Sequence, residues 1–191
     1  MKRISLTEIS HYMVRERLQS GDIAIDATLG NGHDCLFLAA CVGETGHIYG
    51  FDIQRQAIES SRQRLQQQQL DSRTTLIQAN HADMREFIPA KFQGQIAVIM
   101  FNLGYLPGTD KTVMTQTHST LQAITVACDL LAGRGVITVM AYPGHKGGDE
   151  ETLKLQSWLQ ELDSAKFSVD TVFSQNHQEH APRLFVLQKL A

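Results

Sequence analysis

Strand-like runs rich in β-branched residues alternate with helix-like stretches along most of this 191-residue chain. Such alternation is typical of a parallel sheet with helices on both faces. The last two runs leave no room for a helix between them, so we expect them to pair antiparallel. The sequence therefore predicts an α/β fold, with a Rossmann-like, seven-stranded, mostly parallel sheet that carries an antiparallel C-terminal hairpin. The predicted strands are 23–28, 47–53, 74–79, 95–101, 135–142, 167–174 and 183–190, and the predicted helices are 5–19, 33–42, 56–69, 112–132 and 150–162.

Two details of these helices can be tested directly. In the first helix, we expect Ile9, Tyr12, Met13 and Leu18 to share the buried face. We expect the fourth helix to end at Gly133, because glycine is the usual residue after a helix C-terminus.

The composition is typical of a globular protein, with 42% hydrophobic and 19% charged residues. We expect one domain over residues 1–191, with a helix in residues 1–20 packed on it. Apolar runs are too short to span a membrane, and the N-terminus is too polar for a secretory signal. The three cysteines, Cys35, Cys41 and Cys128, have no metal-like spacing. We interpret them as free thiols of a cytoplasmic protein that binds no metal.

The net charge of −3 limits the choice of partners. A protein that coats long nucleic acids needs a strongly basic face to neutralise phosphates, and this chain lacks that charge balance. A short, structured RNA target stays compatible with this net charge.

The ligand site is expected at the carboxyl ends of the parallel strands. The first strand runs into DATLGNGHD, in which Gly30 and Gly32 allow a tight turn and a close ligand approach, and Asp26 and Thr28 lie beside them. The second strand ends at Asp52, whose carboxylate is placed to accept hydrogen bonds from a ribose. The pattern predicts a cofactor that contains a nucleoside.

The type of cofactor is suggested by the start of the next helix. A dinucleotide fingerprint has a third glycine where this chain has Cys35. Asp34 would compete with a phosphate at the helix N-terminus but suits a cationic group, such as the methionine end of S-adenosylmethionine. We therefore favour the methyl donor over a dinucleotide, while Asp34 acting only as a helix cap stays an alternative.

Two further strand ends could recognise the substrate and the adenine of the cofactor. His81 or Asn80 is expected to contact adenine. The fourth strand delivers NLGYLPG, in which the Asn102 amide could accept the N–H of an amine and the Tyr105 ring could stack on a planar base. Leu103 belongs to the same loop, and Gly104 and Pro107 would stiffen it. Asn102 also lies beside the expected sulfonium. A tight turn with a buried tyrosine is the alternative.

The fifth strand and the segment after NLGYLPG complete the expected edge. Tyr142 opens a glycine-rich loop that could hold substrate, and His145 could accept a proton there. Lys111 is available to a phosphate. Lys111 and His145 could equally be solvated surface.

The motifs DATLGNGHD, GFDIQ, NLGYLPGTDK and YPGHKGGDEE, in this order, resemble the small class I methyltransferases known as rRNA methylases. The resemblance runs from about residue 5 to the C-terminus. It implies transfer of a methyl group from S-adenosylmethionine to the aminomethyl nitrogen on C5 of uridine 34 in tRNA, with S-adenosylhomocysteine as product. The implied partner is a tRNA anticodon stem-loop, and a homodimer is a candidate assembly.

The resemblance also assigns residues. It places the cofactor loop on Asn31 and Asp34, the ribose contact on Asp52 with Gln54 beside it, and the residue at the end of the third strand on His81. The substrate loop falls on residues 102–107, with Asn102 and Tyr105 as the catalytic pair.

Three alternative functions stay open. The acceptor could be rRNA or a small amine rather than tRNA. The chain could bind S-adenosylmethionine without turning it over. It could also be a dinucleotide oxidoreductase, for which nicotinamide binding would be the test.

Overall fold

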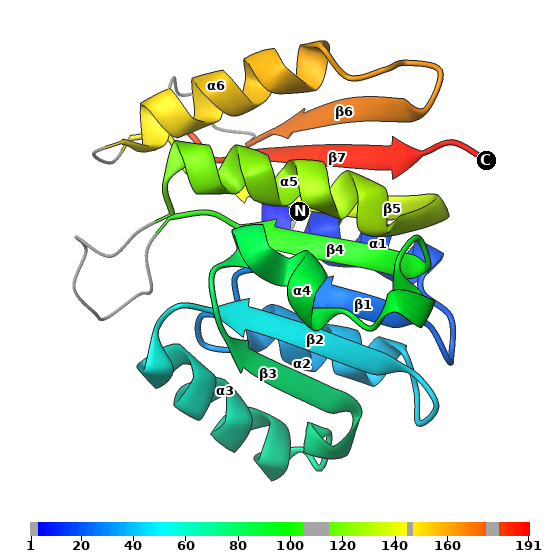
Figure 1. Ribbon diagram of the computed structural model, residues 1–191. Helices are drawn as coiled ribbons and strands as arrows, with labels where there is room; N and C mark the ends of the chain where they lie inside the picture. The colour runs from blue at the N-terminus through cyan, green and yellow to red at the C-terminus, as the bar shows by residue number, and fades with distance from the viewer. Residues whose placement is uncertain (1–3, 105–114, 145–146, 175–179) are drawn as a thin grey trace.

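A mixed seven-stranded sheet forms the centre of the structure, a computed structural model that describes residues 4–104, 115–144, 147–174 and 180–191 (Figure 1). The strand order is β3-β2-β1-β4-β5-β7-β6, in which β7 pairs antiparallel with β5 and β6 and the other pairs are parallel. The predicted fold class is thereby confirmed. The strands are β1 Ile23–Asp26, β2 His47–Asp52, β3 Thr74–Gln78, β4 Ile96–Asn102, β5 Leu131–Ala141, β6 Phe167–Phe173 and β7 Arg183–Lys189.

Helices cover both faces of the sheet (Figure 1). Side chains of α4, α5 and α6 belong to one apolar cluster, while those of α1, α2 and α3 belong to a second cluster on the other face. From Val98 to Phe101, successive β4 residues alternate between the two clusters, which explains why this part of the strand is apolar throughout. The helices are α1 Leu6–Arg17, α2 His33–Cys41, α3 Arg55–Gln67, α4 Met84–Phe87, α5 Thr117–Leu130 and α6 Gly148–Gln160, with 3₁₀ turns at Asp71–Arg73, His81–Asp83 and Ala90–Phe92.

Helix α1 packs on the sheet, but one residue of its predicted face was wrong. A capping box begins the helix, because Glu8 N donates to Ser5 Oγ and Ser5 N donates to the Glu8 carboxylate. Ile9 and Met13 pack beside β5 and β7, whereas the Tyr12 side chain is 66% exposed. Tyr12 lies about 100° around the helix from Met13, which turns it towards solvent.

The end of α5 also differs from the prediction. The helix ends at Leu130, and Leu131 already has extended dihedral angles and begins β5, so Gly133 lies inside the strand. Lys189 Nζ, from β7, donates to the carbonyls of Cys128 and Leu131 at 3.0 and 2.8 Å. A distant lysine thus satisfies acceptors at this helix end that a glycine turn would otherwise satisfy.

The chain order places a crevice at the middle of the sheet. From β1 the chain moves outwards to β2 and β3, then crosses back to pair β4 with the other side of β1. This reversal between β1 and β4 is the position at which open α/β sheets bind ligands, at the carboxyl ends of the strands.

Candidate active site

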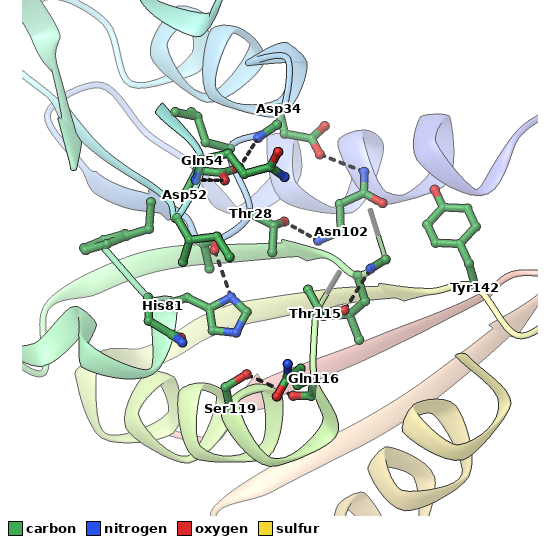
Figure 2. A pocket seen from close by; sticks show the side chains of 18 of the residues that line it. Thr28, Asp34, Asp52, Gln54, His81, Asn102, Thr115, Gln116, Ser119 and Tyr142 are labelled. Carbon is green, nitrogen blue, oxygen red and sulfur yellow. Dashed lines mark hydrogen bonds between the residues drawn. The ribbon is translucent and has the colours of Figure 1, made fainter. Parts of the chain in front are cut away.

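A cavity of about 720 Å³ lies at this edge of the sheet, over the carboxyl ends of β1, β2, β4 and β5 (Figure 2). Its size falls within the roughly 300–1,000 Å³ range of small-molecule sites. Residues predicted from the sequence line it, among them Thr28, Gly30, Asn31, Asp34, Asp52, Gln54, Asn80, His81, Asn102, Leu103 and Gly104. Tyr142, predicted as a substrate contact, lines it as well.

The β1–α2 loop forms one wall through two left-handed glycines. Gly30 and Gly32 have φ angles of 51° and 75°, which other residues rarely adopt. A Cβ on Gly32 would lie 2.6 Å from Ser61 Oγ in α3. Gly32 therefore lets the loop pack tightly against α3 behind the cavity, and it does not itself line the cavity.

Asp52 joins this loop to the end of β2. One carboxylate oxygen accepts from Gly30 N at 2.9 Å, and the other accepts from Gln54 N at 2.8 Å. Burial raises the pKa of the carboxyl, and these backbone N–H groups oppose that rise. Each oxygen keeps a further lone pair, so the carboxylate can accept two hydroxyl groups as well.

His81 lies on the opposite wall, in the turn after β3. Its ring is buried edge-on against Phe101, and its Nδ1 lies 3.2 Å from the carbonyl oxygen of Ala27. Burial lowers the pKa of His81, which favours the neutral ring. Because a carbonyl only accepts, Nδ1–H donates to it and Nε2 is left as an acceptor. Such an acceptor can receive the amino group of adenine.

Asn102 ends β4 in the middle of the cavity. Its backbone N–H donates to Thr28 Oγ1 at 2.6 Å, and its Nδ2 donates to Asp34 Oδ2 at 3.3 Å (Figure 2). The other oxygen of Asp34 bonds His11 Nε2 at 2.7 Å. Asp34 thus contacts α1 and β4 rather than capping its own helix, for which no side-chain cap bond is found.

A hydrogen-bonded clamp follows Asn102. Gly104 N donates to Thr115 Oγ1 and Thr115 N donates to the Gly104 carbonyl, at 2.9 and 2.8 Å. The buried Glu151 of α6 in turn accepts from the hydroxyls of Thr115 and Thr120, at 2.9 and 2.6 Å. The two ends of segment 104–115 are thereby fixed to each other and to α6.

Tyr142 lies beside Asn102 at the end of β5 (Figure 2). Burial raises the pKa of its hydroxyl, and the charge of Asp34 raises it further. The hydroxyl therefore stays neutral and available as a hydrogen-bond donor or acceptor.

Some predicted residues do not reach the cavity or cannot be placed. Asp26 is buried below it, at 1% exposure, and does not line it. Tyr105, Pro107, Lys111 and His145 lie outside the described residues.

The sequence reasoning missed several residues of the cavity wall. Thr115, Gln116 and Ser119 line it, but the predicted helix over residues 112–132 included the first two, which lie in irregular structure before α5. His118 lines the cavity too. The contact of His11 with Asp34 was also missed, because histidine on a polar helix face carries no signal of a partner.

Two findings concern other kinds of site. Among the described residues, no group of three or more His, Cys, Asp or Glu side chains could hold a metal ion. No helix in those parts of the chain is long and apolar enough to cross a membrane.

Comparison with known proteins identifies the family. Residues 48–188 match the protein family described as "Putative rRNA methylase". The chain belongs to this family. It is 37% identical over 157 residues to the chloroplastic tRNA (mnm(5)s(2)U34)-methyltransferase of Arabidopsis thaliana, an alignment that covers 78% of this chain and 57% of that protein. The chain thus spans little more than half the length of this relative.

Two solved structures resemble this fold over the whole chain. A putative rRNA-methylase from Clostridium thermocellum has a TM-score of 0.92 and 37% identity, covering 100% of this chain and 99% of that one. A putative methyltransferase from Streptococcus mutans in complex with SAH has a TM-score of 0.86 and 33% identity, with the same coverage. The fold is that of Rossmann-like class I methyltransferases.

Proposed function

We propose that this chain is an S-adenosylmethionine-dependent methyltransferase that acts on the aminomethyl nitrogen on C5 of uridine 34 in tRNA. The product would be 5-methylaminomethyl-(2-thio)uridine, with S-adenosylhomocysteine released. The rRNA methylase family, the name of the Arabidopsis relative and the SAH complex of the Streptococcus structure support this proposal.

The residues of the cavity fit the cofactor. Asp52 offers acceptors for both ribose hydroxyls, and His81 Nε2 offers one for the adenine amino group. Gly30 and Asn31 supply backbone next to Asp52, and Gln54 lies on the same wall. When bound, S-adenosylmethionine supplies the methyl group as a sulfonium.

The proposal depends on the hydrogen bond between the Asn102 amide and Asp34. Its Nδ2 is bonded to Asp34, so its Oδ1 is the amide atom left to accept a substrate N–H. An amine attacks only in its neutral form, and a partly buried site lowers an amine's pKa. With the amide oxygen and the Tyr142 hydroxyl holding the N–H groups, the nitrogen lone pair can point at the methyl carbon. We expect alignment to contribute most of the rate.

Replacement of Asn102 tests this role. Asn102→Ala should reduce turnover by about 100-fold, because the amine loses its alignment, while the Kd for SAH changes less than about 3-fold. Transfer of labelled methyl groups to tRNA from cells lacking the protein gives turnover, and calorimetry gives the Kd.

Gln93→Ala is a matched control for that measurement. Gln93 also carries a side-chain amide, which bonds the Ile88 carbonyl, but it precedes β4 at the opposite edge of the sheet. It should leave both values unchanged. An equal loss of SAH binding and turnover in Asn102→Ala would contradict the assignment.

Ribosomal RNA is a second candidate acceptor, because the family description names it. Nucleoside mass spectrometry of tRNA and rRNA from a deletion strain separates the two. Accumulation of aminomethyl-2-thiouridine in tRNA is expected, whereas a lost methyl group in rRNA would favour the alternative.

The remaining roles are proposals of the same kind. Leu103, Gly104, Tyr105 and Pro107 would form the wall for the base, and Lys111 and His145 would lie at its rim. The anticodon stem-loop as partner, catalysis without a metal, a homodimer and a cytoplasmic location stay predictions.

A further inference from the structure

Three side chains from separate elements form a hydrogen-bonded series at the edge of the cavity. His11 of α1 lies 2.7 Å from Asp34 Oδ1, and Asn102 Nδ2 of β4 donates to Asp34 Oδ2 at 3.3 Å. His11 and Asp34 are partly buried, with side chains 26% and 12% exposed. His11 does not line the cavity, so it reaches the site only through Asp34.

The chemistry of Asp34 determines how the Asn102 amide is oriented. An ionised carboxylate only accepts hydrogen bonds, so the NH₂ end of the amide must face it. The carbonyl oxygen is then turned away from Asp34, as Figure 2 shows. The reversed amide would set two acceptors against each other and leave an N–H group towards the substrate amine.

His11 is itself held rigidly. Its ring is stacked on Phe37 of α2, with centroids 3.9 Å apart and planes at 3°. The Arg15 guanidinium lies 5.5 Å from the centroid of the same Phe37 ring. The stack fixes the direction of His11 Nε2–H, and that bond fixes the Asp34 carboxylate.

We propose that His11 is a positioning residue, which orients the Asn102 amide through Asp34 so that its oxygen receives the substrate amine. This inference rests on the proposed function, in which Asn102 contacts that amine. Helix α1 thereby becomes part of the active site, although it contributes no side chain to the cavity wall.

Two substitutions separate the hydrogen bond from the ring. His11→Phe keeps the stack on Phe37 but removes the donor to Asp34. His11→Gln removes the ring but keeps an N–H group that can reach the carboxylate. We expect His11→Phe to lower kcat about 10-fold, with the KM for tRNA and the Kd for SAH changed less than about 2-fold, and His11→Gln to restore most of kcat.

His47→Phe is a matched control. His47 Nε2 also bonds a side chain, Thr75 Oγ1, at 2.8 Å, and its ring also contacts an aromatic residue, Tyr49. It lies at the start of β2, at the opposite edge of the sheet. This variant should keep the wild-type kcat.

A measurement independent of activity follows the Asn102 amide directly. The chain has only four asparagines, so a sample labelled with ¹⁵N-asparagine gives four side-chain NH₂ pairs. The pair lost in Asn102→Ala identifies Asn102. We expect that pair to shift in His11→Phe, to return towards its wild-type position in His11→Gln, and to stay unchanged in His47→Phe.

The outcomes distinguish this inference from the proposed function. Unshifted Asn102 signals in His11→Phe, or a folded His11→Gln as slow as His11→Phe, would overturn the role of His11. Wild-type turnover in Asn102→Ala would instead overturn the proposed function, and the NMR result would still decide whether His11 orients the amide.

Discussion

At the scale of single residues, Asp26 is a buried carboxyl group whose hydrogen bonds are incomplete. It is buried at the end of β1, and within the described part of the chain its Oδ2 has no hydrogen-bond partner. Burial raises its pKa well above the usual value, the charge of Asp34 raises it further, and the Thr28 N–H opposes this. The folded protein therefore holds this proton at a pH where the unfolded chain has released it.

Asp26→Asn should change how stability depends on pH. Above the unfolded pKa of about 3.9, the native state binds more protons than the unfolded state, so wild-type stability falls as pH rises towards the native pKa. The Asp26→Asn variant has no carboxyl to titrate at this position, so this fall in stability does not occur in it. Its free energy of unfolding relative to wild type should rise by about 1 kcal/mol or more across that window. Urea unfolding between pH 4 and pH 8 measures the difference, and a constant difference would contradict the assignment.

At the scale of elements, the packing of the β1–α2 loop on α3 shapes the cofactor wall. Gly32 meets Ser61 so closely that no side chain fits between the loop and the helix. Gly94, before β4, has the same φ of 75°, but a Cβ there would meet nothing within 4 Å. Comparing the same substitution at Gly32 and at Gly94 therefore separates the cost of backbone strain from the cost of crowding against a neighbour.

Gly32→Ala should be more harmful than Gly94→Ala. Both variants carry the left-handed backbone cost of roughly 1–2 kcal/mol. Gly32→Ala adds an overpacking cost of about 1–3 kcal/mol and should weaken SAH binding, since the loop must move. Urea unfolding and calorimetry with SAH test this. Equal destabilisation of the two variants would show that the β1–α2 loop can move away from Ser61 without a loss of folding free energy.

At the scale of the whole molecule, the carboxyl ends of the parallel strands and their opposite ends contribute differently to binding and to stability. The cavity occupies the carboxyl edge of the parallel strands, while Lys189 joins β7 to the end of α5 at the opposite edge. Stability and ligand binding should therefore be separable.

Lys189→Met tests that separation. It removes two hydrogen bonds from a charged donor and should lower the free energy of unfolding by about 1–3 kcal/mol. The Kd for SAH, measured well below the unfolding temperature, should be unchanged. A weakened Kd would mean that the two edges are coupled.

Local patterns in the sequence predicted much of the fold. The apolar runs gave every strand within a few residues, because a buried parallel strand such as β4 needs almost no polar residues. The end of α5 was wrong because its carbonyls are satisfied by Lys189, about 60 residues further along the chain. That residues 1–191 form one domain stays a prediction.

The site was predictable where strand ends determine it. Asp52, His81 and Asn102 line the cavity because parallel strands end at one edge. The partnership of His11 with Asp34 depends on how α1 crosses the sheet, which no local pattern shows. The functional roles of these residues stay predictions.

The strand order has a consequence for biosynthesis. Strand β6 precedes β7 along the chain, yet in the sheet it is joined to β5 only through β7. While the nascent polypeptide leaves the ribosome, β6 can find its native neighbour only after β7 has been translated. Until β7 takes its place, the edges of β5 and β6 that face it are both unpaired, and an unpaired strand edge can pair with another chain.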